Sequence, residues 1–558
     1  MQTDKAGPTE SARSGGALER STADLIALGV ARGAVVVGVL SALSRILGLT
    51  RTVVFSQTVG SGCLGTAYVT ASQVPNLIYE LAIGGALASA MVPVLARAAA
   101  RAHAEEDQKE YVAQVTSALL TWSVVILLPV TVGIAVAAHP IASLLMPPNP
   151  NAACSRPAML GTATDMIIAF APQIVFYGIS VVLTGLLQAY RRFTGPTLGP
   201  VLANAVIIVA FLVFASLDKN TPMTRTPLIA QLVLSIGTTI NIAMLVIVMV
   251  PPTWRLHLRL RPTLRLPPGV LRLAGGLALV GLLEFLASDL CTVVTIALAN
   301  GHGTTGAVVL VNYSTMVFSS ICSVLPIAIV TSMFPVIAAA DDATFNQTSA
   351  GSTRAVMLMS WLGTAVIAAV AVPAAYVLVS QHDQVSQLAQ TFLLCAPGVA
   401  GFGVIACMSR VMFAIGRLTA AGIGLVAGPL LQAALSFPLV ALVPPRLVVP
   451  ALTVASSVAL LVVAVPMVLA IRRFRGPAAV AGVGRATFAG IVAGAAGAAV
   501  GVGVALVVPA DGKLFEAASA VVATVLAVLV FGAVAYALDR DDLNIVVARL
   551  RRVGVSRG

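Results

Sequence analysis

Charged side chains are scarce in this sequence. Only 10% of its 558 residues are Asp, Glu, Lys or Arg, whereas 58% are hydrophobic and the mean hydropathy is +0.99. Such a composition excludes an ordinary soluble domain. Apolar runs of about 20 residues recur from one end of the chain to the other, which predicts helices that cross a membrane.

Residues suited to catalysis are also few. The five histidines lie in loops or at the ends of apolar runs, and no nucleophile, base and orienting group come together in the sequence. Cys291, Cys322, Cys395 and Cys407 lie in apolar runs without histidine partners at metal-ligand spacing, which favours small buried hydrophobes. No Walker-type nucleotide loop is present. We therefore expect a non-enzyme with no metal site and no cofactor.

The other two cysteines, Cys63 and Cys154, fall in expected outer loops. A disulfide is chemically permitted on that side of the membrane. Nothing in the sequence shows whether these two residues meet, so their pairing stays open.

The apolar runs predict an all-α polytopic membrane protein. We count about 14 spans, centred near residues 46, 82, 126, 176, 207, 239, 284, 322, 366, 400, 431, 460, 496 and 526. Residues 1–32 lack the hydrophobic core and cleavage site of a signal peptide. We expect them to form a disordered cytoplasmic tail and the first span to be retained.

Basic residues are distributed unequally between the two sides. With the amino terminus inside, 25 of the 33 Lys and Arg lie in cytoplasmic segments, three lie within spans, and five lie in outer loops: Arg156, Lys219, Arg225, Arg446 and Lys513. Because Lys and Arg near span ends stay cytoplasmic, both termini are predicted to lie in the cytoplasm. The net charge of +12 then reflects topology and contact with anionic membrane lipids, and not a nucleic-acid partner.

Two segments of the sequence repeat. The segment 187–195, which closes the fourth span, resembles 412–420, which closes the tenth, and 92–96 resembles 334–338. The offsets of 225 and 242 residues each equal six spans, which predicts two parallel six-helix lobes with a substrate site between them near the midplane. The expected domains are lobes at 33–250 and 270–475, a basic cytoplasmic linker at 251–269, an additional helix pair at 476–540 and a basic cytoplasmic tail at 541–558.

Proline and glycine mark expected bends and contacts within the spans. Residues of this kind let one lobe pivot against the other, although close packing of small residues is an alternative. The expected hinges are Gly48, Pro75, Pro326 and Pro397. The thirteenth span carries Gly490-x-x-x-Gly494 and Gly497-x-x-x-Gly501, which predicts a face for close packing of another helix.

Two arginines, Arg45 and Arg51, lie inside the first apolar run. A cation at membrane depth is costly, so the pair is a candidate for binding an anionic ligand; structural ion pairing is the alternative. Six residues on a straight helix give a rise of about 9 Å and a rotation of about 120°, so the two could line one cavity at different depths. Further candidate substrate-binding residues are Gln73, Asn76, Tyr79 and Arg410, with Gln173, Tyr177 and Asn204 as additional hydrogen-bonding groups.

Three acids also fall within spans. Glu80, Glu284 and Asp289 could neutralise the arginines in structural ion pairs, or could carry a coupling proton or sodium ion. Arg410 lies seven residues from Arg417, so its side chain could instead snorkel to the cytoplasmic surface. An inside-negative membrane potential favours outward movement of each negative charge by about 2.3 kcal/mol per 100 mV, so an anion could be exported without ATP.

The run Ser44-Arg45-Ile46-Leu47-Gly48-Leu49-Thr50-Arg51, followed by Gln73-Val74-Pro75-Asn76-Leu77 and Val92-Pro93-Val94-Leu95, resembles the amino-terminal signature of a known family. The family that this signature resembles is the MurJ/MviN lipid II flippases, which belong to the multidrug/oligosaccharidyl-lipid/polysaccharide exporter superfamily. The Gly/Ala/Val/Arg-rich composition resembles that of actinobacterial members. The resemblance extends over all spans. It implies two six-helix lobes, a terminal helix pair that forms a groove for the lipid tail, and a cationic central cavity.

The resemblance implies a function as well. Members of the family move undecaprenyl-diphosphate-linked peptidoglycan precursor from the inner to the outer leaflet of the bacterial plasma membrane, for cell-wall synthesis. By position, Arg45 and Arg51 match the two first-helix arginines of the family, and Pro75 and Asn76 match its second-helix motif. Lipid II and cell-wall synthesis proteins are the partners that it implies.

This chain also departs from the family pattern. It has Thr52 and Thr66 where many members have acids, Tyr79 and Glu80 where basic residues often follow the Pro-Asn-Leu motif, and no arginine in 314–318. The cavity is therefore expected to be less cationic than the family pattern. A related exporter of another polyprenyl-linked glycan or of drugs, and a transport-inactive scaffold for cell-wall enzymes, remain alternatives.

Overall fold

The computed structural model describes residues 36–540 apart from 83–105, 152, 219–222, 224–225, 266–269, 380 and 508–511. In this part the chain is helical, without strands, and 13 helices are long and apolar enough to cross a membrane. The second expected span, centred near residue 82, falls at the end of α2 (Cys63–Ala82), and residues 83–105 lie outside the described part of the chain. The all-α polytopic fold is confirmed. The expected tails at 1–32 and 541–558 lie outside the described residues.

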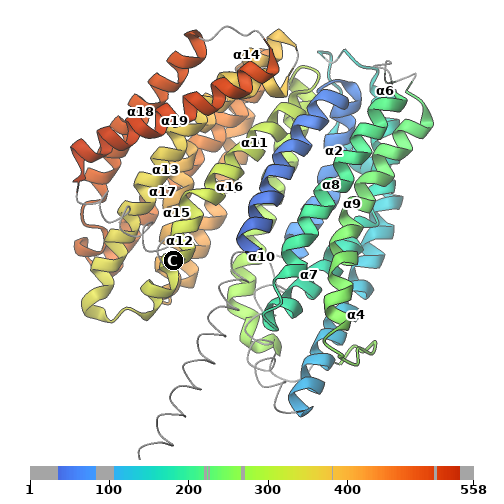
Figure 1. The fold of residues 1–558 in the computed structure, drawn as a ribbon, viewed down its shortest axis with the longest axis horizontal. Helices are drawn as coiled ribbons and strands as arrows, with labels where there is room; N and C mark the ends of the chain where they lie inside the picture. Colours follow the sequence, from blue (N-terminus) through green and yellow to red (C-terminus); the bar gives the residue numbers. More distant parts are fainter. Residues whose placement is uncertain are drawn as a thin grey trace, which may run out of the picture.

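The helices form two groups that lie side by side (Figure 1). The first contains the helix Val36–Thr58, α2, α4 (Glu106–Val136), α5 (Ala138–Leu145), α6 (Arg156–Phe170), α7 (Gln173–Ala189), α8 (Thr194–Leu217) and α9 (Leu228–Trp254). The second contains α10 (Val270–His302), α11 (Ala307–Val324), α12 (Pro326–Ala339), α13 (Asp342–Leu378), α14 (His382–Cys395), α15 (Gly398–Ala414), α16 (Leu418–Ala441) and α17 (Val448–Arg475). We refer to these groups as the N lobe and the C lobe.

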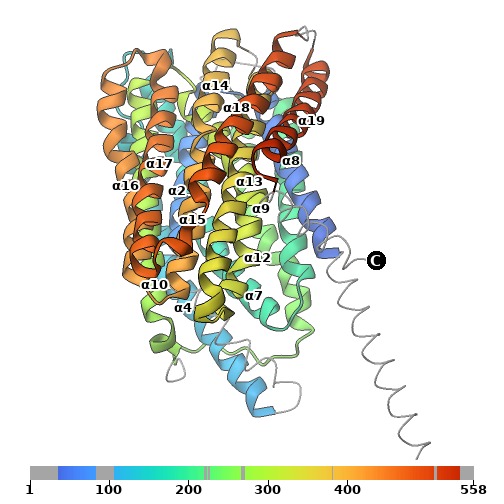
Figure 2. The same cartoon turned by 90° about the vertical axis from the view of Figure 1, so that its left-hand side faces the viewer.

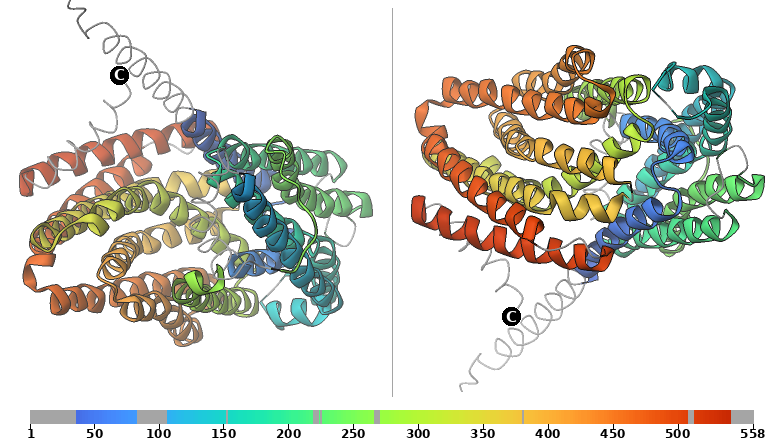
Figure 3. Two further views of the ribbon diagram at one scale, coloured as in Figure 1. Left: turned by 90° about the horizontal axis from the view of Figure 1, so that it is seen from below. Right: turned by 90° about the horizontal axis from the view of Figure 1, so that it is seen from above.

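The helix Val36–Thr58 lies where the two lobes meet, and it is bonded to both. Asn204 of α8 donates to the Ser44 carbonyl at 3.4 Å, and on the other side Gln57 donates to the Val377 carbonyl of α13 at 2.9 Å. The views from below and above show the same two-lobed arrangement (Figure 3). Residues of this helix can therefore reach the interface between the lobes.

The sequence repeat is visible in the backbone that ends α7 and α15. The N–H of Arg192 donates to the Leu187 carbonyl at 2.8 Å, and the N–H of Arg417 donates to the Met412 carbonyl at 2.9 Å. The residue before each donor is left-handed, with φ of 56° at Arg191 and 72° at Gly416. Both helices thus end in the same Schellman-type turn, at positions that differ by the predicted offset of 225 residues.

This turn gives opposite predictions for its two left-handed residues. Gly416→Ala should destabilise the protein by about 1 kcal/mol, because left-handed backbone is costly for any residue with a Cβ, and Arg191→Gly should stabilise it by up to about the same amount. A Cβ at Gly416 would have open space, so only backbone strain is involved. Thermal unfolding in detergent measures both changes. Gly484→Ala, also in open space but without positive φ, is the control, and equal stability of Gly416→Ala and wild type would contradict the prediction.

Prolines interrupt the helices at two of the four expected hinges. Pro326 begins α12 directly after α11 ends, and Pro397 separates α14 from α15. Pro172 separates α6 from α7 in the same way, again offset by 225 residues from Pro397. Gly48 and Pro75 instead lie in uninterrupted helix. The described structure thus shows helix breaks at Pro326 and Pro397 but none at the other two positions.

The helix pair α18 (Val483–Val507) and α19 (Lys513–Leu538) packs on α13, and Figure 2 shows it on the opposite side of the C lobe from α16. A Cβ added to Gly490 would come within 2.4 Å of the Trp361 ring, and one added to Gly501 within 2.2 Å of the Ala369 Cβ. Glycine is therefore required for the backbones to approach this closely. The close helix packing predicted from the GxxxG patterns is confirmed.

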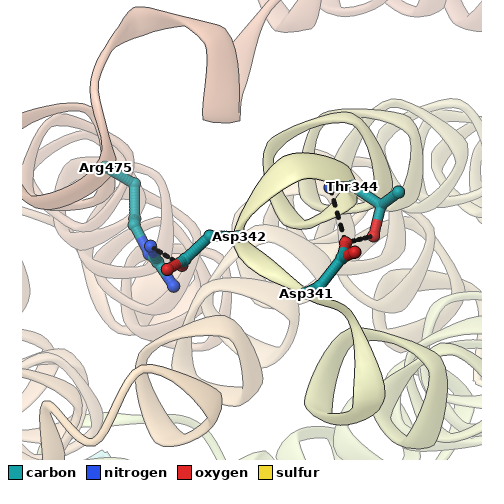
Figure 4. Close-up of polar contacts among 4 residues, drawn as sticks. All are labelled: Asp341, Asp342, Thr344 and Arg475. Carbon is teal, nitrogen blue, oxygen red and sulfur yellow. Dashed lines mark hydrogen bonds and ion pairs between the residues drawn. The ribbon is translucent and has the colours of Figure 1, made fainter.

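The start of α13 is fixed by two neighbouring carboxylates (Figure 4). Asp341 caps the helix by accepting hydrogen bonds from the Thr344 N–H at 3.0 Å and from the Thr344 hydroxyl. Asp342 pairs with Arg475 at the end of α17 at 2.6 Å, and the same guanidinium lies over the Phe345 ring. These contacts join the ends of two C-lobe helices.

The cap predicts a pH-dependent stability of the first turn of α13. The hydrogen bonds from Thr344 hold the pKa of Asp341 below its usual value, so the stabilisation is complete above the ordinary Asp pKa and is lost as the pH falls through the lowered one. Asp341→Ala should increase hydrogen exchange of this turn at neutral pH and have less effect in acid, whereas Asp341→Asn should retain the cap. Exchange in Asp341→Ala that equals wild type at neutral pH would contradict the assignment.

Candidate functional site

Among the described residues, two adjoining cavities lie where the lobes meet. The larger, of about 400 Å³, is bounded by α2 on one side and by α10, α11, α16 and α17 on the other. The smaller, of about 130 Å³, lies among the helix Val36–Thr58, α2, α7, α8 and α9, with α11 at one side. Val69, Gln73, Asn76 and Asn312 line both cavities. The two cavities thus share a wall, and we refer to them as the large and the small cavity.

Arg51 lines the small cavity and is half-buried. It is the one charged side chain among the residues that line this cavity, and no ion pair of Arg51 is found within the described part of the chain. A guanidinium presents five donors in a fixed fork, which suits the oxygens of a phosphate group. The guanidinium of Arg51 can therefore present its donors to an anionic group in this cavity.

Buried polar atoms without partners surround the same space. Among the described residues, the Oδ1 of Asn241 and the hydroxyl of Tyr313 have no hydrogen-bond partner, and these two cavity-lining residues are 5% and 1% exposed. Leaving such groups unpaired costs free energy, so they are available to a ligand or to water. Neither residue was predicted from the sequence. Asn241 could have been found by the signal that identified Gln73, which is an amide side chain within an apolar span. Tyr313 gives no such signal, because tyrosine is a common type of buried side chain.

The predicted amide residues of α2 do reach the cavities. Gln73 and Asn76 line both, and the Oδ1 of Asn76 accepts a hydrogen bond from the hydroxyl of Tyr177 at 3.0 Å. Gln173 also lines the small cavity, where its amide donates to Thr239 at 3.2 Å. The structure thus brings together Arg51 and both predicted amides of α2.

Tyr79 and Asn204 lie outside the lining of both cavities. The Tyr79 ring stacks on Tyr177, with ring centroids 4.1 Å apart and planes inclined by 29°. Since Tyr177 lines the small cavity, Tyr79 supports a cavity residue and does not itself line the space. Asn204 holds the helix Val36–Thr58 through the Ser44 carbonyl.

Arg45 and Arg51 do not line one cavity, contrary to the sequence-based expectation. Arg45 is exposed and donates from Nη1 to the hydroxyl of Ser323 in α11 at 2.7 Å. The helix is uninterrupted between the two arginines, so the rotation of about 120° directs them to different neighbours. Arg45 therefore links the first helix to the C lobe in this conformation.

Arg410 of α15 and Glu284 of α10 line neither cavity. The charge of Arg410 acts on the carboxylate of Glu284. No ion pair within 4.0 Å joins these two described side chains, so the structural pairing predicted as one alternative for Glu284 stays a prediction. This arrangement gives Arg410 no contact with the space that Arg51 lines.

Glu80 and Asp289 face one another across the lobe interface. Glu80 of α2 lines the large cavity, and its carboxyl group lies within interaction range of that of Asp289 on α10. Asp289 is 7% exposed, and no other described residue donates a hydrogen bond to either of its oxygens. Neither acid therefore neutralises a described arginine. In the described part of the chain, no group of three or more His, Cys, Asp and Glu side chains is placed to bind a metal ion.

The ends of the lobes near the starts of α6 and α14 are bonded to each other. Asn149 of the N lobe donates to the carbonyls of Asn300 and Gly303 at 2.7 and 2.8 Å, and Ser61 donates to the side-chain carbonyl of Gln384 in α14. We call these contacts the outer latch. They join the two lobes at the side predicted to face outward.

A disulfide joins Cys63 to Cys154, and their Cα atoms are 5.9 Å apart. The pairing that the sequence left open is thus present. It connects the start of α2 with the segment that follows Asn149, so both ends lie within the N lobe. The bond fixes the N-lobe side of the outer latch without crossing to the C lobe.

Comparison with known sequences identifies a family. The family model described as lipid II flippase MurJ matches residues 55–531. The lipid II flippase MurJ of Burkholderia cenocepacia is 29% identical over 168 residues, which are 30% of this chain and 31% of that protein. The probable lipid II flippase MurJ of Rhizobium meliloti is 25% identical over 172 residues, 31% of this chain and 30% of that protein. The aligned segments thus span about a third of these curated relatives.

Solved structures share the fold. A lipid II flippase MurJ in an inward closed conformation matches with a TM-score of 0.68 and 16% identity, over 90% of this chain and 99% of that chain. An inward-facing multidrug resistance MATE family transporter of the MOP superfamily matches with a TM-score of 0.60 and 15% identity, over 78% of this chain and 95% of that chain. At these identities the likeness concerns the fold alone. Because the family model spans most of the chain, the protein belongs to the lipid II flippase MurJ family.

Proposed function

We propose that this protein moves lipid II, the undecaprenyl-diphosphate-linked peptidoglycan precursor, from the inner to the outer leaflet of the bacterial plasma membrane. The observation that supports this proposal is Arg51, a guanidinium without an acidic partner among the described residues that line the small cavity. Its planar fork is suited to the diphosphate, and the adjoining large cavity of about 400 Å³ has room for part of a headgroup.

The proposed mechanism is alternating access. The headgroup is held between the lobes while the polyprenyl tail stays in lipid, and the lobes rock about the broken helices so that the outer latch opens as the inner side closes. Both termini lie in the cytoplasm in this scheme. The inside-negative potential favours outward movement of the diphosphate by about 2.3 kcal/mol per charge per 100 mV, so no nucleotide is required.

Reconstitution into vesicles tests the proposal. Purified protein in proteoliposomes should move lipid II between leaflets, and a flippase-depleted strain that carries the gene should accumulate lipid II in the outer leaflet. Transport of another polyprenyl-linked glycan or of a drug in place of lipid II would identify a related exporter. No transport together with retention of cell-wall enzymes would identify a membrane scaffold.

A further inference from the structure

The chain that joins α10 to α11 in the C lobe enters between two segments of the N lobe. A Cβ added to Gly306 would come within 2.2 Å of the Ser61 carbonyl oxygen, and one added to Gly301 within 2.8 Å of the Pro147 Cγ. Gly306 also has a φ of 88°, which favours glycine. These glycines thus let the C-lobe chain touch both N-lobe segments. We refer to residues 303–306 as the C-lobe turn.

The N-lobe segment that contains Pro147 donates hydrogen bonds to the C-lobe turn. Asn149 donates to the Gly303 carbonyl at 2.8 Å. The N–H of Ala153 donates to the Thr305 hydroxyl at 3.0 Å. Both bonds join neutral groups, so each alone contributes little. The closed arrangement therefore depends on several of these bonds forming together.

The segment that contains Ser61 reaches the same turn through α14. Ser61 donates to the side-chain carbonyl of Gln384. The amide of Gln384 in turn donates to the Thr305 carbonyl at 3.2 Å. Thr305 is thus bonded to both N-lobe segments, directly to one and through Gln384 to the other.

The disulfide between Cys63 and Cys154 joins these two segments. Cys63 lies two residues after Ser61 and Cys154 directly follows Ala153, so each cysteine is beside a residue that bonds to the C lobe. The two cysteines are 91 residues apart in the chain, and their Cα atoms are 5.9 Å apart. Because the bond keeps both segments in place when the C-lobe turn has left, fewer residues have to be ordered each time the lobes close.

A small reagent can reach the disulfide. Both cysteines are half-buried, and Cys154 lines a third, separate cavity of about 40 Å³ that Asn149 and Thr305 also line. The other four cysteines of the chain are free and buried. Since a reductant acts on disulfides and not on thiols, it changes this one bond of the chain.

We propose that this disulfide is a redox switch that favours closure of the outer latch, and that its reduction shifts the lobes toward separation at that end. In the reducing step a dithiol gives up two electrons and two protons and becomes a disulfide, while the bond between Cys63 and Cys154 breaks and leaves two thiols. The bond lies within the N lobe, so both redox forms can open and close, and only the equilibrium between the two states changes. Such a switch acts on the conformation of the protein whichever substrate it carries, and so goes beyond the proposed function.

Distance measurements between the lobes test this switch. Spin-labelled noncanonical amino acids replace Ser216 at the end of α8 and Leu442 after α16, two exposed positions on different lobes, so that every cysteine stays native. Pulsed electron paramagnetic resonance on the full chain in nanodiscs, with and without dithiothreitol, then gives the open and closed populations. The ratio of open to closed protein should rise about tenfold on reduction, the factor that corresponds to ordering about one more backbone residue on closure.

Asn149→Ala tests whether the disulfide acts through the outer latch. Asn149 supplies two bonds from the braced segment to the C lobe, so its loss should open the oxidised protein and reduce the redox effect to about twofold or less. Ser143→Ala is the matched control. The Ser143 hydroxyl donates to the Pro140 carbonyl within α5 at 2.8 Å, so the full redox effect should remain in this variant.

Equal ratios of open to closed protein before and after complete reduction, checked by mass spectrometry, would overturn the inference. Reduction that lowers the thermal stability but leaves the ratio unchanged would also overturn it, because the bond would then only stabilise the N lobe. An undiminished redox effect in Asn149→Ala would do the same, because the bond would then act away from the latch. Lipid II transport by both redox forms is measured separately, so failure of the proposed function leaves the distance measurement unaffected.

Discussion

Replacing Arg51 by alanine should reduce lipid II transport by about 100-fold while the protein remains folded and abundant in the membrane. Truncating one partner of a desolvated charge pair costs about 2–5 kcal/mol, and each 1.4 kcal/mol is a factor of ten. Arg51 is the one charged residue among the described residues that line the small cavity, and none of the others there can replace its charge. Transport of fluorescent or radiolabelled lipid II in proteoliposomes, corrected for protein content, measures the change.

Two further variants separate charge from position. Arg51→Lys keeps the charge but loses the planar fork, and should retain part of the activity, about tenfold below wild type. Arg45→Ala lies on the same helix but removes an exposed contact with Ser323 outside both cavities, so its effect should be only a fewfold change. Transport by Arg51→Ala at the wild-type rate, or a greater loss in Arg45→Ala, would refute the assignment of the phosphate site.

The fold could be predicted largely from the sequence because membrane spans and repeats have strong signals. A run of about 20 apolar residues has few alternatives to a membrane helix. The offset of 225 residues between the repeated segments recurs as equivalent helix breaks at Pro172 and Pro397 and as equivalent turns at Arg191 and Gly416. Local backbone chemistry and global duplication thus agree, which is why the predicted spans coincide with helices in the described part of the chain.

The site was less predictable because it depends on which face of each helix meets which neighbour. Arg45 and Arg51 are equivalent as charges in an apolar run, but about 120° of rotation places only Arg51 in a cavity. The disulfide of Cys63 with Cys154 depends on loop positions 91 residues apart, and no spacing rule predicts such a pairing.

Locking the outer latch should abolish transport completely. In a background where Cys63 and Cys154 are replaced by serine, Ser61→Cys with Gln384→Cys places one thiol on each lobe, at two positions whose native side chains are hydrogen bonded. Alternating access requires these ends to separate, so a short thiol cross-link should reduce lipid II flipping to the level of empty vesicles, and a reductant should restore it.

The native disulfide supplies the control for this experiment. It joins Cys63 to Cys154 within the N lobe, so its presence should not prevent the lobes from separating, and wild type should transport lipid II before and after reduction. Each single-cysteine variant should be insensitive to the cross-linker, because the remaining cysteines are buried. Undiminished transport by fully cross-linked protein would show that the outer ends stay together throughout the cycle. The substrate would then have to leave by a route other than separation of the lobes.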